Sequence, residues 1–260
     1  MTDLLPYQYL LIALLFIWSG FVRSGLGFGG SVLSLPFLLL IVDDPLVFLP
    51  IIGVHLMLFS TLITWQNRNK TRAQADTQQQ VAGNIDWHYL RYSIKVMIIP
   101  KLIGVFGLLT LPATLMSSII YVIVIGYAIS YVLNRPFKSN SRTLDTLFLI
   151  LGGYISGTSL IGAPLIVAVY ASHVAKHQLR DTLFVLWFIL VLIKLLSFLI
   201  AGVDLQLVHH LWLLPCAYIG HLIGERVHQR MVEAENSVFY RVLGSVLICV
   251  SSIGLIKALI

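Results

Sequence analysis

The sequence predicts an all-α polytopic membrane protein built from two inverted repeats, each a glycine-rich broken-helix hairpin followed by three transmembrane helices. Composition is the first observation: 58% of the 260 residues are hydrophobic and only 11% are charged, against roughly 25% charged in an average soluble domain. The second is a series of apolar segments long enough to cross a bilayer. The third is a pair of apolar segments that clustered glycines interrupt at corresponding places in the two halves.

Six apolar segments have lengths close to the about 20 residues that a helix needs to cross a ~30 Å hydrocarbon core. They are residues 45–65, 92–109, 113–133, 182–201, 205–224 and 238–258. Asp44 precedes Pro45 at the start of the first, and Asp181 precedes the start of the fourth. Because aspartate caps helix N-termini well and proline is tolerated at the first helical position, we expect both aspartates to be N-caps.

Two further apolar segments, residues 7–41 and 144–172, are each broken near the middle. The interrupting residues are Arg23, Ser24, Gly25, Gly27, Gly29 and Gly30 in the first, and Gly152, Gly153, Ser156, Gly157, Gly162 and Pro164 in the second. We expect arms of roughly 13–16 residues, which reach only about 20–24 Å at 1.5 Å per residue. Each segment is therefore predicted to form a hairpin of helices.

The two broken segments also resemble each other in sequence. Leu15, Phe16, Gly20, Ser24, Gly25, Gly30 and Leu33 align without gaps with Leu147, Phe148, Gly152, Ser156, Gly157, Gly162 and Leu165. A chance alignment of glycine-rich apolar stretches is the alternative, but the matches fall at the same place in each half. We therefore predict a first repeat over residues 1–133, a cytoplasmic linker over 134–143 and a second repeat over 144–260.

Lysine and arginine are concentrated in alternate loops, which predicts the topology because such loops face the cytoplasm. The basic loops are 66–91, 134–143, 173–181 and 225–241, and the loops without lysine or arginine are 1–6, 42–44, 110–112 and 202–204. If each broken segment crossed once, loops 134–143 and 173–181 would lie on opposite sides. If each returns as a hairpin, every basic loop is cytoplasmic and both termini lie outside. Each half then crosses the membrane three times, and because three is odd the second half is inverted relative to the first. Inverted repeats with broken helices are typical of secondary transporters.

The breaks have the chemistry of an anion site. A half-helix that begins there presents free N–H groups and a partial positive charge, and glycines allow a ligand to approach the backbone. The alternative is that the glycines only permit close helix packing. The residues that we expect to bind substrate are Arg23, Ser24, Gly25, Gly27, Gly29, Gly30, Ser31, Lys101, Ser156, Gly157, Thr158, Ser159, Gly162 and Lys194.

Three of these residues are cations within apolar segments, where each costs roughly 2.5–3.5 kcal/mol at a helix centre. Arg23 lies at the first break and is the strongest candidate, because its planar fork suits an oxyanion. Lys101 lies in the middle of its segment. Lys194 lies two-thirds of the way along its own, so that extension toward the outer interface is an alternative to a substrate role.

The sequence also excludes several kinds of site. Every aspartate and glutamate lies in a loop or at a helix end, which argues against ion coupling through a buried carboxylate. His55 is the remaining titratable residue in mid-segment, and we favour a hydrogen-bonded structural role for it. His173 and His177 have helical spacing and His209 and His210 are adjacent, but further metal ligands are not evident nearby. We expect no metal, no cofactor and no enzymatic activity.

The two breaks carry a family resemblance. The run Ser24 to Pro36 (SGLGFGGSVLSLP) and the run Gly153 to Ile166 (GYISGTSLIGAPLI) resemble the two glycine-rich motifs of the sulfite exporter TauE/SafE family. Ser31, Ser159 and Ile161 stand where glycines are usual in these motifs, so the substrate stays open. The resemblance implies a bacterial inner-membrane transporter of small anions, often sulfur-containing, such as sulfite or a sulfonate.

We therefore expect a secondary transporter that exports such an anion and binds it near the midplane, where the two hairpins meet. An inside-negative potential expels anions, at about 2.3 kcal/mol per charge per 100 mV. The alternatives are uptake of a similar anion or a small carboxylate, and a membrane-embedded enzyme or assembly factor without transport. The expected partners are the anion and the lipid bilayer, with no nucleic acid; a homodimer is an arrangement that the sequence leaves open.

Overall fold

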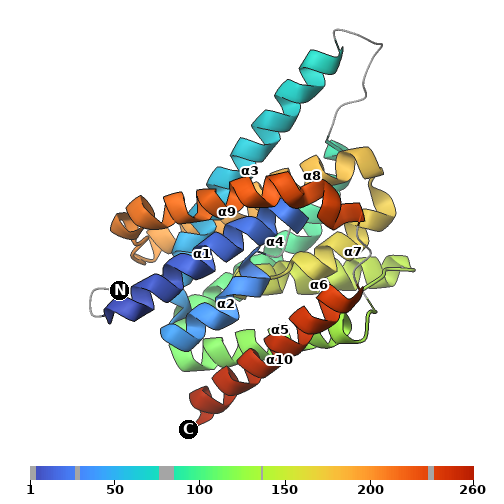
Figure 1. Cartoon of the computed structure of the whole chain (residues 1–260). Helices are drawn as coiled ribbons and strands as arrows, with labels where there is room; N and C mark the ends of the chain where they lie inside the picture. The colour runs from blue at the N-terminus through green and yellow to red at the C-terminus, as the bar shows by residue number, and fades with distance from the viewer. Residues whose placement is uncertain (1–3, 27–29, 76–84, 136, 234–236) are drawn as a thin grey trace.

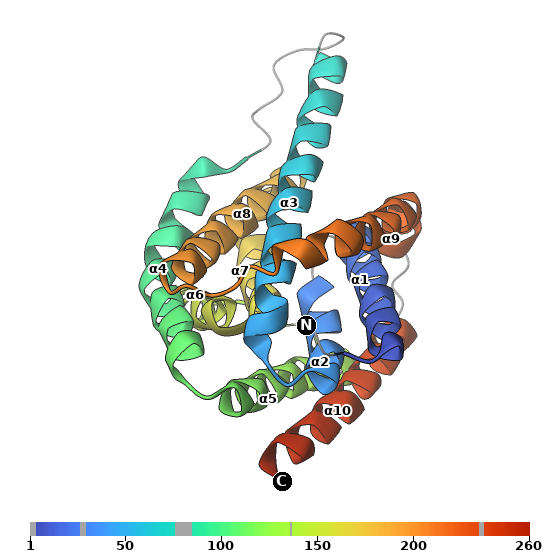
Figure 2. The same ribbon diagram turned by 90° about the vertical axis from the view of Figure 1, so that its left-hand side faces the viewer.

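The computed structural model describes residues 4–26, 30–75, 85–135, 137–233 and 237–260. Within these ranges the chain forms ten helices and no strand. The helices are α1 Pro6–Leu26, α2 Gly30–Ile41, α3 Pro45–Ala75, α4 Trp87–Thr110, α5 Ala113–Val132, α6 Arg142–Ser159, α7 Ala163–His173, α8 Lys176–Ile200, α9 Leu207–Glu233 and α10 Ser237–Leu259. Figure 1 shows them as one bundle, and in the view of Figure 2 the short α2 and α7 lie in the middle of the long helices.

Most of these helices have the length and composition of membrane spans. In the part of the chain that the structure describes, seven helices are long and apolar enough to cross a bilayer: α1, α3, α4, α5, α8, α9 and α10. The helices α2 and α7 are apolar but shorter. The prediction of an all-α, multi-pass membrane protein is confirmed, and α1 joins the six segments that the sequence predicted to cross.

The hairpins differ from the prediction in the lengths of their arms. The first consists of α1 with 21 residues and α2 with 12, and the second of α6 with 18 and α7 with 11. Equal short arms were therefore wrong. A glycine inside a helix costs only about 1 kcal/mol relative to alanine, and close packing offsets that cost. Gly20 lies inside α1 at a close contact with α9. A Cβ at this position would lie 2.1 Å from the carbonyl oxygen of Ala217, so only glycine fits.

Helix starts confirm one predicted cap and correct the other. The Asp44 carboxylate accepts a hydrogen bond of 2.8 Å from the backbone N–H of Leu46, so it caps α3 as predicted. Asp181 is wrong as an N-cap, because α8 already begins at Lys176 with Ala175 in the cap position. The helix begins Lys-His-Gln-Leu-Arg, in which all residues but the histidine are good helix formers, so nothing there prevents the helix from starting before Asp181.

Two helices extend beyond the apolar segments that predicted them. The sequence predicted loops from residue 66 and from residue 225, but α3 continues to Ala75 and α9 to Glu233. Figures 1 and 2 show the end of α3 projecting past the other helices. Hydropathy locates the part of a helix that lies in lipid, whereas the backbone hydrogen bonds continue into water as long as the residues favour a helix.

Helices from the first half of the chain pack closely against helices from the second half. The first arm α1 packs against α9, and the first arm α6 packs against α4; α3 packs against α8, and α5 against α10. Figure 2 shows these pairs side by side. Glycines permit the closest approaches: a Cβ on Gly220 would lie 1.9 Å from the carbonyl oxygen of Ile17, and one on Gly104 would lie 2.3 Å from that of Tyr154. Each hairpin is thus held mainly by the opposite half.

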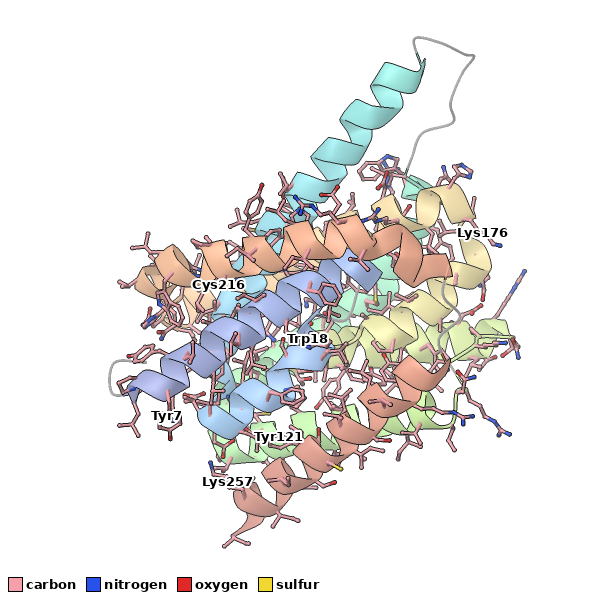
Figure 3. All side chains as sticks on the ribbon, viewed as in Figure 1. Tyr7, Trp18, Tyr121, Lys176, Cys216 and Lys257 are labelled. Atoms are coloured by element: carbon pink, nitrogen blue, oxygen red, sulfur yellow. The ribbon has the colours of Figure 1, made fainter. Side chains whose placement is uncertain are left out.

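The bundle has two distinct ends. Figure 3 shows Tyr7, at the start of α1, and Lys257, near the end of α10, at one end, and Lys176 at the other. Figure 1 likewise shows α1 beginning and α10 ending at the same end of the bundle. The first and last helices thus begin and end, respectively, at the same end of the bundle.

Candidate functional site

The breaks of the two hairpins meet in the interior. Ser31, in the first turn of α2, donates a hydrogen bond of 2.9 Å from its hydroxyl to the carbonyl oxygen of Leu160. Leu160 ends α6 in the left-handed conformation, with φ of 60°, which turns the chain sharply toward α7. Residues 129 positions apart in the sequence are thereby joined at the centre of the molecule.

A small cavity of about 30 Å³ lies at this junction. Its polar lining consists of Arg23, Gly30, Ser31, Ser156 and Gly162, so both breaks contribute. The remaining wall is apolar and comes from Leu56, Leu160, Ala163, Phe184, Trp187, Leu190 and Val191. Such a volume holds about one or two water molecules, which means that the helices are closed around the site in this conformation.

The short helices begin beside their long partners in the same way in both halves. A Cβ on Gly30 would lie 2.8 Å from the Ser19 carbonyl oxygen and 3.2 Å from the Arg23 Cβ. A Cβ on Gly162 would lie 2.2 Å from the Gly152 carbonyl oxygen and 3.1 Å from the Ser156 nitrogen. The lack of a side chain therefore lets α2 and α7 start against the interior turns of α1 and α6, and places both N-termini at the cavity.

Arg23 supplies a permanent charge at this point. It is 3% exposed, and its Nη2 donates a long hydrogen bond of 3.5 Å to the Ser19 hydroxyl. Its Nε and Nη1 are buried and have no partner among the described residues. The guanidinium also lies over the Phe59 ring, 5.2 Å from the ring centroid. A buried guanidinium normally has its donors paired, because an unpaired charge in a low dielectric is costly, so these two donors are available to an anion or to water.

The two buried lysines, Lys101 and Lys194, donate hydrogen bonds to the last turn of α6. Lys101 donates to the Ser156 hydroxyl at 3.1 Å and to its carbonyl oxygen at 3.3 Å, and Lys194 donates to the Gly157 carbonyl oxygen at 2.8 Å. Carbonyls in the last turn of a helix lack intrahelical partners and attract cations. Both lysines are buried, so Lys194 does not extend to the outer interface. They border the cavity through Ser156 without lining it.

The other predicted residues lie around the cavity without facing it. The Ser24 hydroxyl is 2.6 Å from His221 Nδ1 in α9, and the backbone nitrogen of Gly25 packs against Gly224, where a Cβ would come within 3.0 Å. The hydroxyls of Thr158 and Ser159 both donate to the Ile155 carbonyl oxygen, at 3.0 and 2.9 Å.

Gly157 has a packing role as well. A Cβ there would lie 2.3 Å from the Lys101 carbonyl oxygen in α4, so its side of α6 is closed by another helix. Gly27 and Gly29, also predicted as binding residues, lie outside the residues that the structure describes.

The aromatic wall of the cavity was missed by sequence reasoning. Phe184 and Trp187 are three residues apart and share a face of α8 with Leu190 and Val191. Sequence reasoning had little signal for them, because Trp187 is the sixth residue of the predicted segment 182–201 and tryptophan is common near the ends of membrane spans. These side chains form an apolar part of the cavity lining.

His55 is not the hydrogen-bonded structural histidine that the sequence favoured. It is fully buried in α3, and neither ring nitrogen has a hydrogen-bond partner among the described residues. Within the same ranges, no three His, Cys, Asp or Glu side chains gather as a metal site would require.

In a comparison with protein-family models, residues 11–253 match the model of the family described as Sulfite exporter TauE/SafE. Comparison with curated proteins and with solved structures gave no match. The matched range includes both glycine-rich breaks and all but a few residues of the bundle. Members of this family are membrane transporters. The chain therefore belongs to the sulfite exporter TauE/SafE family.

Proposed function

We propose that this protein is a secondary transporter that exports a small sulfur-containing anion, such as sulfite or a sulfonate, across the bacterial inner membrane. The anion binds in the cavity lined by Arg23, Gly30, Ser31, Ser156 and Gly162. Family membership supports transport of sulfur anions, and the choice of substrate, direction and site rests on the arguments below.

The observation that carries the proposed site is Arg23, a buried guanidinium with two donors that have no partner among the described residues, in a cavity that the starts of two helices also line. The first turns of α2 and α7 bring unpaired N–H groups and partial positive charge to the same cavity. The Ser31 and Ser156 hydroxyls lie beside them. A sulfonate or sulfite presents three oxygens, which suits a fork of donors on one side and backbone N–H groups on the other.

The packing of the halves supports a moving hairpin as the transport device. If the halves are inverted repeats, α1 corresponds to α6 and α4 to α9. A contact between two elements should then recur between their counterparts, and α1 with α9 and α6 with α4 are such a pair of contacts. Gly30 and Ser31 at the start of α2, and Leu160 and Gly162 between α6 and α7, line a cavity inside the protein, which is where non-helical backbone is tolerated in a membrane. Rocking of the hairpins would then open the site to either side alternately.

Export follows from charge and potential. With the basic loops cytoplasmic and both termini outside, the potential favours outward movement of an anion by about 2.3 kcal/mol per charge per 100 mV. Among the described residues, the lining holds the Arg23 guanidinium and backbone dipoles and no carboxylate, so the bound anion carries its own charge through the field. No coupling cation is needed for net export.

The test has two stages. First, unfolding temperatures of the purified protein are measured with sulfite, thiosulfate, taurine, sulfoacetate, acetate and succinate. We expect at least one sulfur oxyanion to stabilise the protein and the carboxylates to have no effect. Second, efflux of that anion from proteoliposomes is measured with and without an inside-negative potassium diffusion potential, with protein-free liposomes as control. Stabilisation by the carboxylates alone, or efflux that the potential does not accelerate, would contradict the proposal.

A further inference from the structure

Beside the anion cavity, α1, α3 and α9 enclose a second group of polar side chains. The His55 ring of α3 lies 5.2 Å from the Phe16 ring of α1 and 5.3 Å from the His210 ring of α9, between centroids. His210 donates a hydrogen bond of 3.0 Å from Nε2 to the Leu205 carbonyl oxygen, and its Nδ1 has no partner among the described residues. His55 is buried, and in the part of the chain that the structure describes neither of its ring nitrogens has a hydrogen-bond partner.

A third histidine between the same helices shows how unusual His55 is. His221 of α9 is as well buried, but its Nδ1 lies 2.6 Å from the Ser24 hydroxyl and its Nε2 lies 3.8 Å from a Glu225 carboxylate oxygen. A neutral imidazole has one donor and one acceptor, and buried polar groups are normally satisfied. The ring nitrogens of His55, which have no partner among the described residues, therefore point to a role with a ligand or a proton.

His55 is placed to respond to an anion in the cavity. Its neighbour in the chain, Leu56, lines the cavity, and Phe59, one helical turn further, carries the Arg23 guanidinium over its ring. Arg23 and His210 are the groups whose charges act on His55 from α1 and α9. From α8, the side chains that meet this stretch of α3 at Gly53 are the apolar Leu195 and Val191, and Lys194 of that helix is held by the Gly157 carbonyl.

We propose that His55 binds a proton when a dianion binds at Arg23, so that two positive charges face two negative ones in the loaded site. This inference rests on the proposed function of the cavity. In the empty site the positive charge of Arg23 opposes a second charge nearby, and burial opposes it further. A dianion reverses the sign of that field and leaves one negative charge unbalanced in a low-dielectric interior, which the protonated imidazole neutralises. A monoanion is balanced by Arg23 alone and requires no proton.

Linkage makes this testable through affinity. If a dianion favours protonated His55, then protonation favours the dianion by the same factor. Thiosulfate stays a dianion and methanesulfonate a monoanion between about pH 6 and 8, where histidine commonly titrates. We expect the thiosulfate dissociation constant to fall by up to tenfold per pH unit on acidification, which is the limit for one linked proton. The constant for methanesulfonate should stay within about twofold, since no proton is linked to it.

The experiment measures binding of both probes by isothermal titration calorimetry in two buffers of different ionisation enthalpy, which counts protons taken up. Wild type should take up one proton with thiosulfate and none with methanesulfonate. In His55→Gln the thiosulfate affinity should become independent of pH and fall to that of the wild type at high pH, and the methanesulfonate affinity should not change. His177→Gln, an exposed histidine at the start of α8, is the matched control and should behave as wild type.

Each outcome is decisive. No proton uptake with thiosulfate in wild type overturns the inference, and so does uptake that persists in His55→Gln. If His55→Gln does not fold, nitrogen-15 spectra of histidine-labelled wild type replace it: one buried histidine should become doubly protonated with thiosulfate and not with methanesulfonate, and its failure to do so overturns the inference. Wild type that binds neither probe contradicts the proposed function itself, a result distinct from binding without a proton.

Discussion

The hydroxyl of Ser31 donates to the carbonyl oxygen of Leu160 at 2.9 Å, joining the start of α2 to the end of α6. One partner opens the short helix of the first hairpin and the other closes the long helix of the second. Leu160 ends α6, so its carbonyl has no partner within that helix, and Ser31 lies in the first turn of α2. Their contact therefore holds the end of one helix and the start of the other at the same depth. The mutations below follow from the cavity that this contact borders.

Replacement of Arg23 should weaken anion binding more than replacement of Lys194. A charge-assisted hydrogen bond is worth roughly 1.5–3 kcal/mol, so Arg23→Ala should raise the dissociation constant about tenfold to a hundredfold. Lys194 is held by the Gly157 carbonyl, so Lys194→Ala should lower the unfolding temperature with a smaller change in affinity. Calorimetric titration with the anion identified by the thermal-shift series measures both effects.

Arg23→Lys refines this comparison, because it keeps the charge and removes the planar fork. Partial binding would indicate that the field of the charge matters more than bidentate contact. An Arg23→Ala protein that is folded and binds with wild-type affinity would exclude Arg23 from the site and leave the backbone N–H groups of α2 and α7 as the main contacts.

A side chain at Gly157 should break the packing of α6 on α4. A Cβ there would lie 2.3 Å from the Lys101 carbonyl oxygen and 3.1 Å from the Gly104 Cα, and backbone atoms cannot move away cheaply. We expect Gly157→Ala to lower the unfolding temperature by several degrees and Gly157→Val to prevent folding.

Gly126→Ala in α5 is the matched control, because nothing lies within 4 Å of a Cβ at that position; it should leave stability equal or higher. Circular dichroism in detergent during heating measures each variant. A Gly157→Ala protein with wild-type stability but no anion binding would assign Gly157 to the site instead of to the packing.

Trp187 should limit the size of the transported anion. It is 7% exposed and forms one wall of a cavity of about 30 Å³. Trp187→Ala removes the indole and leaves the polar lining in place, so larger sulfonates should gain affinity relative to sulfite. Competition between sulfite and a series of alkanesulfonates of increasing length measures the change. Trp87→Ala, at an exposed tryptophan of α4, should leave the order unaltered; an unaltered order in Trp187→Ala would show that α8 does not bound the anion.

The topology can be tested with single cysteines after replacement of Cys216 and Cys249. Leu111→Cys and Asp204→Cys lie in exposed loops without basic residues, and Asn140→Cys and Ala175→Cys lie in exposed positions of the basic loops. In intact cells the first pair should react with an impermeant maleimide and the second pair only after permeabilisation. Reaction of residues 140 and 175 from opposite sides would exclude the hairpin topology and, with it, the inverted repeat.

The sequence by itself determined the class of the fold and the places where it breaks. Apolar length located the spans, because every crossing helix must match the same hydrocarbon thickness. Clustered glycine and serine located the breaks, and Arg23 emerged because a buried charge is too costly to occur without a reason. These are local properties of composition and spacing, and they are visible without knowledge of any contact.

Only the tertiary structure decided which residues face one another. Ser24 and Ser31 are similar hydroxyls near one break, yet the first lies against His221 of α9 and the second borders the cavity. Lys101 and Lys194 are both buried cations, and their carbonyl partners on α6 could not be deduced from their own segments. The sequence likewise did not reveal that the His55 nitrogens have no partner among the described residues, or that Trp187 lines the cavity. Side-chain partners depend on which helices become neighbours, and in a bilayer close packing between distant segments fixes that choice, whereas apolarity alone does not.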